Sequence, residues 1–536
     1  MEGPSRVSWW RDVGYAGSTY QIPCNRGGLN HNQNTDLIRP EMFVSPSRNI
    51  NLHEGGRRKR GGTAKVNGTA VSGAPTIMGG FDFQLAASSF QVFLGSDGGL
   101  YSNSTTTIKT GMSTVNYPSF AVFENELYVV DGDTTPQTWN GVAAGTSNIT
   151  SPSGDWSGAD QPFQVLVHGR GASRRVFFLF SSTIYGSSLG DGKVVTGGTS
   201  VFFPIDTEDA VGLTGAAEFG NRLILFGRKR AYIFDDEDAS TANWGYAAAP
   251  WKGGAAHWRV IAQTPTDLIV MAEDGDIYSV VAAQEYGDYK QASITRPAFV
   301  DNYIRENVDL AYIQKFHAIY DPALRAVFFW VVRTGQTTVD TALVYFIDRP
   351  AEEAWAVHDN QNTASGYKAA CSFLTRTGAG TYTVYTGDYA GFIWKLNQAT
   401  RSDDSNAYYG GFKTPNLPFD NPRVRKHFRR GVVVAKTQGD YDLQVNIWVD
   451  GESKDATTMS LSGSGGVLGS FILGVDAAAD VLGGSEFLDR KFELGHYGRR
   501  LQLEFYNSGA GEDFFVSQVL IDNKPMGALP SKVGSE

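Results

Sequence analysis

The feature that most constrains the fold of this chain is a short hairpin pattern that recurs along it. In residues 382–396, two runs of alternating β-branched and aromatic residues flank a turn built on Gly387, Asp388 and Gly391. Alternation of this kind around a Gly/Asp turn is typical of an antiparallel hairpin. The same pattern of strand, polar turn and strand ending on an aromatic residue is found at residues 93–102, 122–133, 218–236 and 269–280.

The spacing of the closing aromatic residues predicts a β-propeller over residues 76–400. Most of the gaps are about 40 to 47 residues, which is the length of a four-stranded blade. The markers are Tyr101, Trp139, Tyr185, Tyr232, Tyr278, Tyr345 or Trp355, and Trp394. We therefore expect an all-β chain with six or seven irregular blades. The alternative is a β-sandwich in which the hairpin spacing is a coincidence.

Two regions outside the propeller differ from it in pattern. Residues 1–75 are polar and rich in Asn, and they read as an extended N-terminal arm that either wraps its own chain or contacts a neighbouring subunit. Residues 401–422 read as a linker, because Gly, Pro and Ser interrupt the alternation there. Residues 423–536 resume the alternation and predict a C-terminal antiparallel β-sandwich domain.

Charge and cysteine content exclude several classes of protein. The net charge of −10 argues against a surface that coats nucleic acid, although it is compatible with DNA that slides past without sticking. Cys24 and Cys371 are too few and too far apart for a disulfide framework or a zinc site. No apolar run reaches the roughly 20 residues that cross a membrane, and we expect no membrane-spanning segment. The first residues lack a signal-peptide layout, which predicts synthesis in the cytoplasm without export.

A search for catalytic motifs predicts no enzyme. Metal-ligand spacings such as HExxH, nucleophile elbows and phosphate-binding lysine loops are absent from the sequence. Four hairpin carboxylates, Asp97, Asp131, Asp274 and Asp388, are interpreted as turn formers, although a propeller glycosidase would also place carboxylates around its channel. The acidic runs at residues 235–238 and 403–404 are interpreted as solvated charge, with calcium binding as the alternative. We therefore expect no catalytic residue, no metal and no cofactor.

Two basic clusters remain as candidate contact sites. The first lies between paired glycines in the N-terminal segment, and the second lies at the start of the predicted C-terminal domain. We predict assembly or phosphate contacts for Arg57, Arg58, Lys59, Arg60, Arg423, Arg425, Lys426, Arg429 and Arg430. A flexible, solvated loop tip is the alternative for the first cluster.

Several phrases of the sequence resemble the tail nozzle proteins, also called tail tubular protein B, of short-tailed double-stranded DNA phages (podoviruses). The N-terminal phrases are Gly27-Gly28-Leu29-Asn30, then residues 49–55 and Lys59-Arg60-Gly61. Residues 122–141 and 381–419 extend the resemblance, and Thr414-Pro415 followed by the second basic cluster matches the family's start of the C-terminal β-domain. The phrases cover most of the chain but consist of turn residues, so their specificity is moderate.

The resemblance implies a structural virion protein of the phage tail, assembled in the cytoplasm of the bacterial host. It implies a homohexameric ring below the tail adaptor protein, contacts with a tail fibre or spike protein, and a lumen for transient passage of double-stranded DNA during genome ejection. Six copies would carry a net charge of about −60, which would repel DNA from an acidic wall. We also predict that deleting residues 1–62 leaves a folded propeller but weakens ring or adaptor assembly. The alternatives are a carbohydrate-binding or carbohydrate-cleaving propeller, and a cytosolic propeller scaffold.

Overall fold

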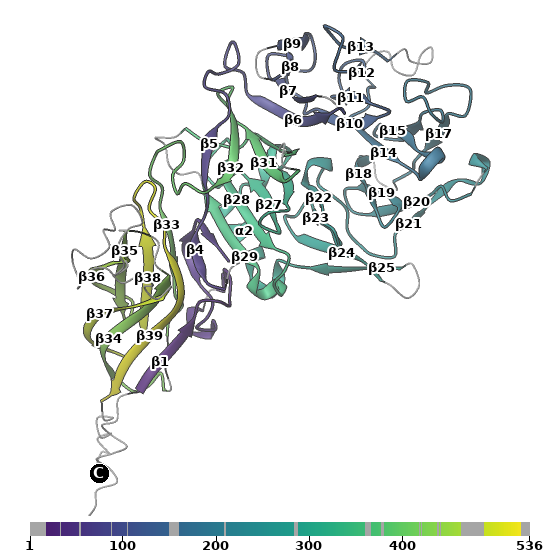
Figure 1. Cartoon of the computed structure of the whole chain (residues 1–536). Helices are drawn as coiled ribbons and strands as arrows, with labels where there is room; N and C mark the ends of the chain where they lie inside the picture. The colour runs from purple at the N-terminus through teal and green to yellow at the C-terminus, as the bar shows by residue number, and fades with distance from the viewer. Residues whose placement is uncertain are drawn as a thin grey trace, which may run out of the picture.

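The computed structural model describes residues 18–526 with short gaps. The gaps fall at residues 33, 53–54, 87, 104–105, 150–159, 208–210, 239, 284–287, 360–365, 377–379, 418, 420, 437–438, 440 and 463–486. Seven four-stranded antiparallel sheets form a β-propeller, and two further sheets form a β-domain beside it (Figure 1). The expected all-β fold is confirmed, with seven blades.

The first four blades follow one another along the chain. Blade 1 is β6 (Ile77–Gln84), β7 (Ser89–Gly95), β8 (Leu100–Ser102) and β9 (Thr106–Lys109); blade 2 is β10 (Ser119–Phe123), β11 (Glu126–Val130), β12 (Gln137–Trp139) and β13 (Ser147–Asn148). Blade 3 is β14 (Gln164–His168), β15 (Arg175–Leu179), β16 (Thr183–Gly186) and β17 (Val201–Pro204); blade 4 is β18 (Leu213–Phe219), β19 (Arg222–Gly227), β20 (Ala231–Asp235) and β21 (Gly245–Ala248).

The last three blades complete the ring. Blade 5 is β22 (Ile261–Gln263), β23 (Asp267–Met271), β24 (Ile277–Ala283) and β25 (Asp288–Ser293); blade 6 is β26 (His317–Asp321), β27 (Ala326–Val331), β28 (Thr341–Phe346) and β29 (Trp355–Asp359). Blade 7 is β30 (Cys371–Arg376), β31 (Tyr382–Gly387), β32 (Ile393–Gln398) and β5 (Gly62–Lys65). The first strands of successive blades contact each other in order, and β30 contacts β6, so the ring is closed.

Helices are short and lie mostly between blades. The α-helix α2 (Val300–Asn307) and the 3-10 helices η5 (Arg296–Ala298) and η6 (Leu310–Lys315) connect blade 5 to blade 6. The other 3-10 helices are η1 (Thr35–Leu37), η2 (Gly171–Ser173), η3 (Thr241–Asn243), η4 (Trp258–Val260) and η7 (Ala351–Glu353). Among the described residues, no helix has the length and apolar character needed to cross a membrane.

The repeated aromatic residues explain why the blades form. Tyr101, Trp139, Tyr185, Tyr232, Tyr278, Tyr345 and Trp394 all lie in the third strand of their blades, one per blade. Each of these side chains is no more than 7% exposed. A large side chain at this position fills the space between neighbouring sheets, so its recurrence marks one blade at a time.

The hairpin of residues 382–396 is fixed by the carboxylate in its turn. Asp388 Oδ1 accepts hydrogen bonds from the backbone N–H groups of Ala390 and Phe392, both at 2.8 Å. Its Oδ2 accepts a third hydrogen bond, from Nε1 of the fully buried Trp394, at 2.8 Å. Burial raises the pKa of Asp388, and these three donors oppose that rise. The turn residue therefore also anchors the aromatic marker of blade 7.

The β-domain consists of two sheets built from both ends of the chain. One has the order β3-β4-β39-β34-β37, with β1 paired to β39, and the other has the order β2-β33-β38-β35-β36. Four of these strands are N-terminal: β1 (Ser18–Pro23), β2 (Val44–Arg48), β3 (Ile50–Asn51) and β4 (Arg57–Lys59). The others are β33 (Gly410–Lys413), β34 (Lys426–Lys436), β35 (Asp442–Val449), β36 (Glu452–Ser460), β37 (Phe487–Gly498), β38 (Leu501–Asn507) and β39 (Phe515–Pro525).

The strand pairing corrects two of the predicted boundaries. Residues 1–75 were expected to be an extended arm that wraps its own chain or contacts a neighbouring subunit, with the propeller starting at residue 76. The described part of this segment does pack on its own chain, but it supplies strands to the β-domain and the last strand of blade 7, so that boundary is wrong. Figure 1 shows the first strands, in purple, beside the last strand, in yellow. Residues 401–422 were expected to be a linker, but they contain β33, which pairs with β2 and β38. Both segments lack local periodicity because partners distant in sequence hold them.

Candidate functional site

The first basic cluster lies inside the molecule, which corrects its prediction as a surface contact. Arg57 and Lys59 are fully buried and Arg60 is 5% exposed, while the side chain of Arg58 is 26% exposed. The Arg57 guanidinium lies over the rings of Phe43, at 5.2 Å, and Phe412, at 4.5 Å, and it donates to the carbonyl of Glu41. Three of the four cations are therefore committed to contacts within their own chain.

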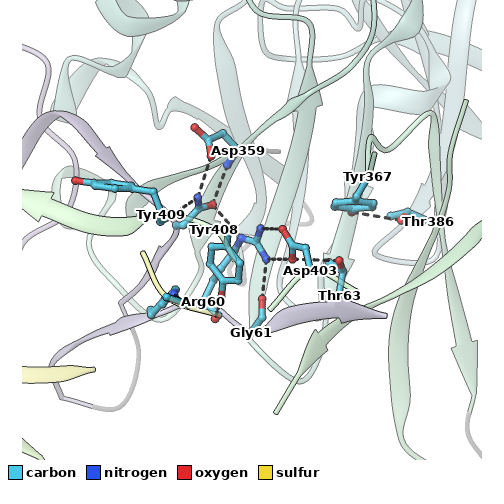
Figure 2. Close-up of polar contacts among 12 residues, drawn as sticks. Arg60, Gly61, Thr63, Asp359, Tyr367, Thr386, Asp403, Tyr408 and Tyr409 are labelled. Atoms are coloured by element: carbon cyan, nitrogen blue, oxygen red, sulfur yellow. Dashed lines mark hydrogen bonds and ion pairs between the residues drawn. The ribbon is translucent and has the colours of Figure 1, made fainter. Parts of the chain in front are cut away.

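Arg60 is the centre of a buried network where the N-terminal strands pass between the two domains. Its guanidinium makes two parallel hydrogen bonds to Asp403, at 3.0 and 2.7 Å (Figure 2). Its other side packs on the ring of Tyr408, 4.0 Å from the ring centroid. Thr63 in β5 also donates to Asp403, which is itself fully buried. Asp403 therefore joins the N-terminal segment to the chain that leaves blade 7, and it is not the solvated charge expected from the sequence.

Asn49 extends the network to blade 6. Its side-chain oxygen accepts from Arg60 Nε at 2.9 Å and from the backbone N–H of Asp359 at 3.0 Å. Its amide nitrogen donates to the Asp359 carboxylate at 2.9 Å and to the carbonyl of Tyr409 at 2.7 Å. Asn49 has a φ of 60°, a left-handed conformation that Asn tolerates better than most residues. One side chain thus connects blade 6, the N-terminal segment and the start of the β-domain.

Lys59 and Arg58 fasten the same segment to the β-domain. Lys59 Nζ donates to Asn507 Oδ1 and to the carbonyl of Gly509, both at 3.0 Å. Burial, together with the charge of Arg60, lowers the pKa of Lys59 to about 8. Arg58 pairs with Asp513 at 2.9 Å, and Asp513 also pairs with Arg401 at 3.0 Å. Arg58 and Lys59 therefore bind the β-domain, whereas Arg60 binds the segment that leaves blade 7.

The second basic cluster is exposed except for one residue. Lys426 is 2% exposed and donates to backbone carbonyls of Asn421 and Val424, so its prediction as a contact residue is corrected. Arg423, Arg425, Arg429 and Arg430 are exposed. The register of β34 shifts between Phe428 and Arg430 against both neighbouring strands, so a β-bulge leaves two consecutive arginines exposed. Their assembly or phosphate contacts remain a prediction.

The hairpin carboxylates cap their own turns, as expected for turn formers. Asp97 accepts from the N–H of Gly99, and Asp274 accepts from the N–H of Asp276. Asp131 accepts from Ser113, Asp133 and Thr134. Within the described ranges, no three His, Cys, Asp or Glu side chains gather in a way that would hold a metal ion.

One residue of the first acidic run has a buried partner, which corrects its interpretation as solvated charge. Asp236 lies 3.2 Å from Nε2 of His168, whose side chain is 2% exposed. Glu218, in the first strand of blade 4, lies 3.6 Å from Nδ1 of the same ring. Burial lowers the pKa of His168, but the hydrogen bond and charge of Asp236, aided by Glu218, outweigh it and raise the pKa. The contacts of His168 with Asp236 and Glu218 therefore tie blade 3 to blade 4.

We expect this contact to make the stability of the propeller depend on pH. Because the pKa of His168 is higher in the folded state, the stabilisation is fully present below the unfolded value of about 6.5 and is lost as pH rises through the folded pKa. Thermal melts of the native chain and His168→Gln should differ by on the order of 1 kcal/mol at pH 5.5 and converge by pH 9. A difference that is equal at both pH values would show that the ring is neutral.

The channel of the propeller holds another buried arginine, Arg259. A cavity of about 440 Å³ is lined by the first strands of all seven blades, and another of about 470 Å³ lies where these strands begin. Arg259 lines both cavities and is 7% exposed. His257 and His317 lie near it, and burial and the charge of Arg259 lower the pKa of His257 to about 3 and that of His317 well below 6.5. Both rings are therefore neutral near pH 7.

Sequence reasoning missed the surroundings of Arg60 and of Arg259. Asp403, Asn49 and Asp359 are separated from Arg60 by as many as 343 residues, and no local period connects them. One available signal was the pair Gly61-Gly62, since a Cβ on Gly62 would lie 2.1 Å from the carbonyl of Ser402. Arg259 follows a Trp and precedes a Val, and nothing in that sequence marks a channel residue.

No protein-family model matches the chain, and a search of the curated proteins finds no match. Among solved structures, the chain is similar to BBS1N in complex with ARL6DN, at 10% identity and a TM-score of 0.40, over 64% of this chain and 99% of that one. It is similar to the computationally designed Ika8 protein at 9% identity and a TM-score of 0.35, over 63% of this chain and 99% of that one. It is also similar to the extracellular domain of BT3049, a hybrid two-component system from B. thetaiotaomicron, at 9% identity and a TM-score of 0.44, over 85% of this chain and 57% of that one. All three scores are below 0.5, so the fold assignment rests on the strand pairing.

Proposed function

We propose that this chain is the ring-forming subunit of a phage tail nozzle, a structural virion protein with a lumen through which double-stranded DNA leaves the particle. The observation that carries the proposal is the path of the N-terminal segment. It contributes strands to both sheets of the β-domain, passes through the buried Arg60–Asp403 network and closes blade 7. A chain fastened in this way resists separation of its two domains, which suits a part that bears load.

The resemblance to tail nozzle proteins supports the same function from the sequence. In a closed cyclic ring each subunit uses two different surfaces, one for each neighbour. The outer face of the six-stranded sheet offers one such surface, where Arg429 and Arg430 lie near Asp522 and Glu493. The adaptor and the fibre or spike protein would then contact other parts of the ring.

A carbohydrate-cleaving propeller is less well supported. Such an enzyme needs a pair of carboxylates across the bond that it cleaves. Asp131 is the carboxylate at the mouth of the channel, and it is 1% exposed and occupied by its own turn. Glu218 lines the channel wall and lies beside His168. No observation favours a sugar over another ligand.

Ring formation is the measurement that tests the proposal. Light scattering and negative-stain imaging of the full chain, alone and mixed with the adaptor ring, should give sixfold rings in at least one condition. The double variant Arg429→Glu/Arg430→Glu should lower the ring fraction at least about tenfold, because like charges facing each other at an interface cost several kcal/mol. Arg305→Glu, on the exposed side of α2, is the matched charge reversal and should leave the ring fraction unchanged. A monomer that ignores the adaptor would contradict the proposal.

A further inference from the structure

Arg259 is a buried cation that lies beside two cavities of the propeller channel. Its Nη2 donates to the carbonyl of Ala370 at 2.9 Å, and its guanidinium lies 3.6 Å from the ring centroid of Tyr117. Nη1 is buried without a hydrogen-bond partner. In the described part of the chain, no ion pair joins Arg259 to a carboxylate. An uncompensated buried charge costs several kcal/mol, so a site that retains one usually has a charged partner.

The histidines beside Arg259 do not supply this partner. His257 donates from Nε2 to the carbonyl of Ile313, at 2.9 Å, and its Nδ1 accepts from the backbone N–H of Arg259. His317 lies 3.1 Å from the carbonyl of Ala369 and 2.9 Å from the hydroxyl of Ser372. Both rings are satisfied as neutral imidazoles. The guanidinium of Arg259 is therefore the group in this part of the channel that a negatively charged ligand would neutralise.

The comparison with Arg60 shows what is missing. Both arginines are nearly fully buried, and both pack on a tyrosine ring. Arg60 has Asp403 as a bidentate partner and abuts packed protein, whereas Arg259 abuts two cavities of about 440 and 470 Å³. Volumes of this size are typical of sites for small molecules. The cavities thus leave room for a ligand beside Arg259.

The residues that line the cavities indicate the chemical character of the rest of the ligand. Aromatic side chains contribute to the walls of both cavities, among them Phe81 and Phe120 in the first and Tyr117 and Phe163 in the second, with Trp258 in both. Polar side chains share these walls, including Glu218 in the first cavity and Asp131 in the second. A dianionic phosphate is normally held by several donors, but the guanidinium has one nitrogen already bonded to a carbonyl. A single negative charge on an apolar body suits one guanidinium surrounded by aromatic rings.

We propose that the propeller channel binds a small monocarboxylate with an apolar body, its carboxylate neutralising Arg259. The site is independent of ring assembly and goes beyond the proposed nozzle function. The ligand would enter at the mouth where the first strands begin, beside Tyr117 and Trp258, and would pair there with the guanidinium. Such a ligand would stabilise the inner wall of the propeller, because it binds only the folded chain.

Calorimetric titration of the full chain with benzoate at constant ionic strength tests this site, with sodium phosphate as the second arm. We expect benzoate to bind with a stoichiometry of one per chain, and Arg259→Gln to weaken it at least tenfold. Arg228→Gln is the matched control, since this side chain also lines the mouth but is paired with Glu273, and it should change the affinity less than twofold. Absence of benzoate binding, equal binding by Arg259→Gln, or preferential binding of phosphate would each overturn the proposal.

A second measurement tests the channel site without a variant, in case Arg259→Gln does not fold. Crystals of the native chain soaked with 4-bromobenzoate should show the anomalous signal of bromine in the channel, with the carboxylate beside Arg259. A bromine located only outside the channel, or no bromine at all, would overturn the proposal. Neither experiment depends on the adaptor, so failure of the channel site and failure of the nozzle function are distinguishable.

Discussion

A chain that lacks residues 1–62 is expected to lose its folded β-domain and to melt without a cooperative transition. The deletion removes β1 to β4, which pair with β39 and β33, and it removes Arg60 from the buried Asp403. Ile22, Leu29, Phe43, Ile50 and Leu52 are at most 1% exposed, and burial of side chains like these contributes about 1.5–3 kcal/mol each. Their sum is comparable to the whole stability of a domain.

Circular dichroism and limited proteolysis measure this effect, with a chain lacking only residues 1–17 as the reference, because it keeps every described strand. A milder variant tests the closeness of the packing. Gly62→Ala places a methyl group 2.1 Å from the carbonyl of Ser402, so it should destabilise blade 7 strongly. Gly68→Ala is the matched control, because a Cβ there meets nothing within 4 Å. A cooperative melt of the truncated chain, within a few degrees of the reference, would return residues 1–62 to the role of a removable arm.

The propeller could be predicted because its determinants are local. Each blade has a large aromatic residue in its third strand, and in most blades a turn that contains Gly or Asp precedes it within about ten residues, as in Asp388 and Trp394. The same units recur along one chain, so the pattern can be recognised without any long-range contact. The boundary of the last blade could not be found in this way, since β5 and β32 are more than three hundred residues apart.

The candidate site was harder to predict because the role of a charged side chain depends on whether that side chain is buried. Four consecutive cations flanked by glycines are typical of a solvated, phosphate-binding loop. Here successive side chains of β4 point to opposite faces of its sheet, so Arg57 and Lys59 face the interior, and the glycines permit close approach to other backbone segments. Asp403 likewise looks solvated beside Asp404 until its partner is known. Only the three-dimensional contacts distinguish these alternatives.

Substitution of one partner of the Arg60–Asp403 pair should therefore lower the free energy of unfolding more than most other single substitutions. Arg60→Met removes the guanidinium and leaves Asp403, which is fully buried, with Thr63 as its remaining side-chain donor. We expect a loss of about 3–5 kcal/mol, the range measured when one partner of a buried ion pair is removed. Hydrogen exchange at the amides of β5 measures the loss directly, because β5 opens when the strands that pass this network separate from the propeller.

Two comparisons identify the cause of that loss. The double variant Arg60→Met/Asp403→Leu should recover part of the lost stability, because it leaves no unpaired charge in the interior. Arg325→Met is the matched control, since Arg325 and Asp348 form a similar pair with side chains 57% and 53% exposed, and its removal should cost far less than removal of Arg60 because water screens an exposed pair. Equal losses for Arg60→Met and Arg325→Met would mean that water reaches the network. The N-terminal segment would then be held by its strand pairing alone.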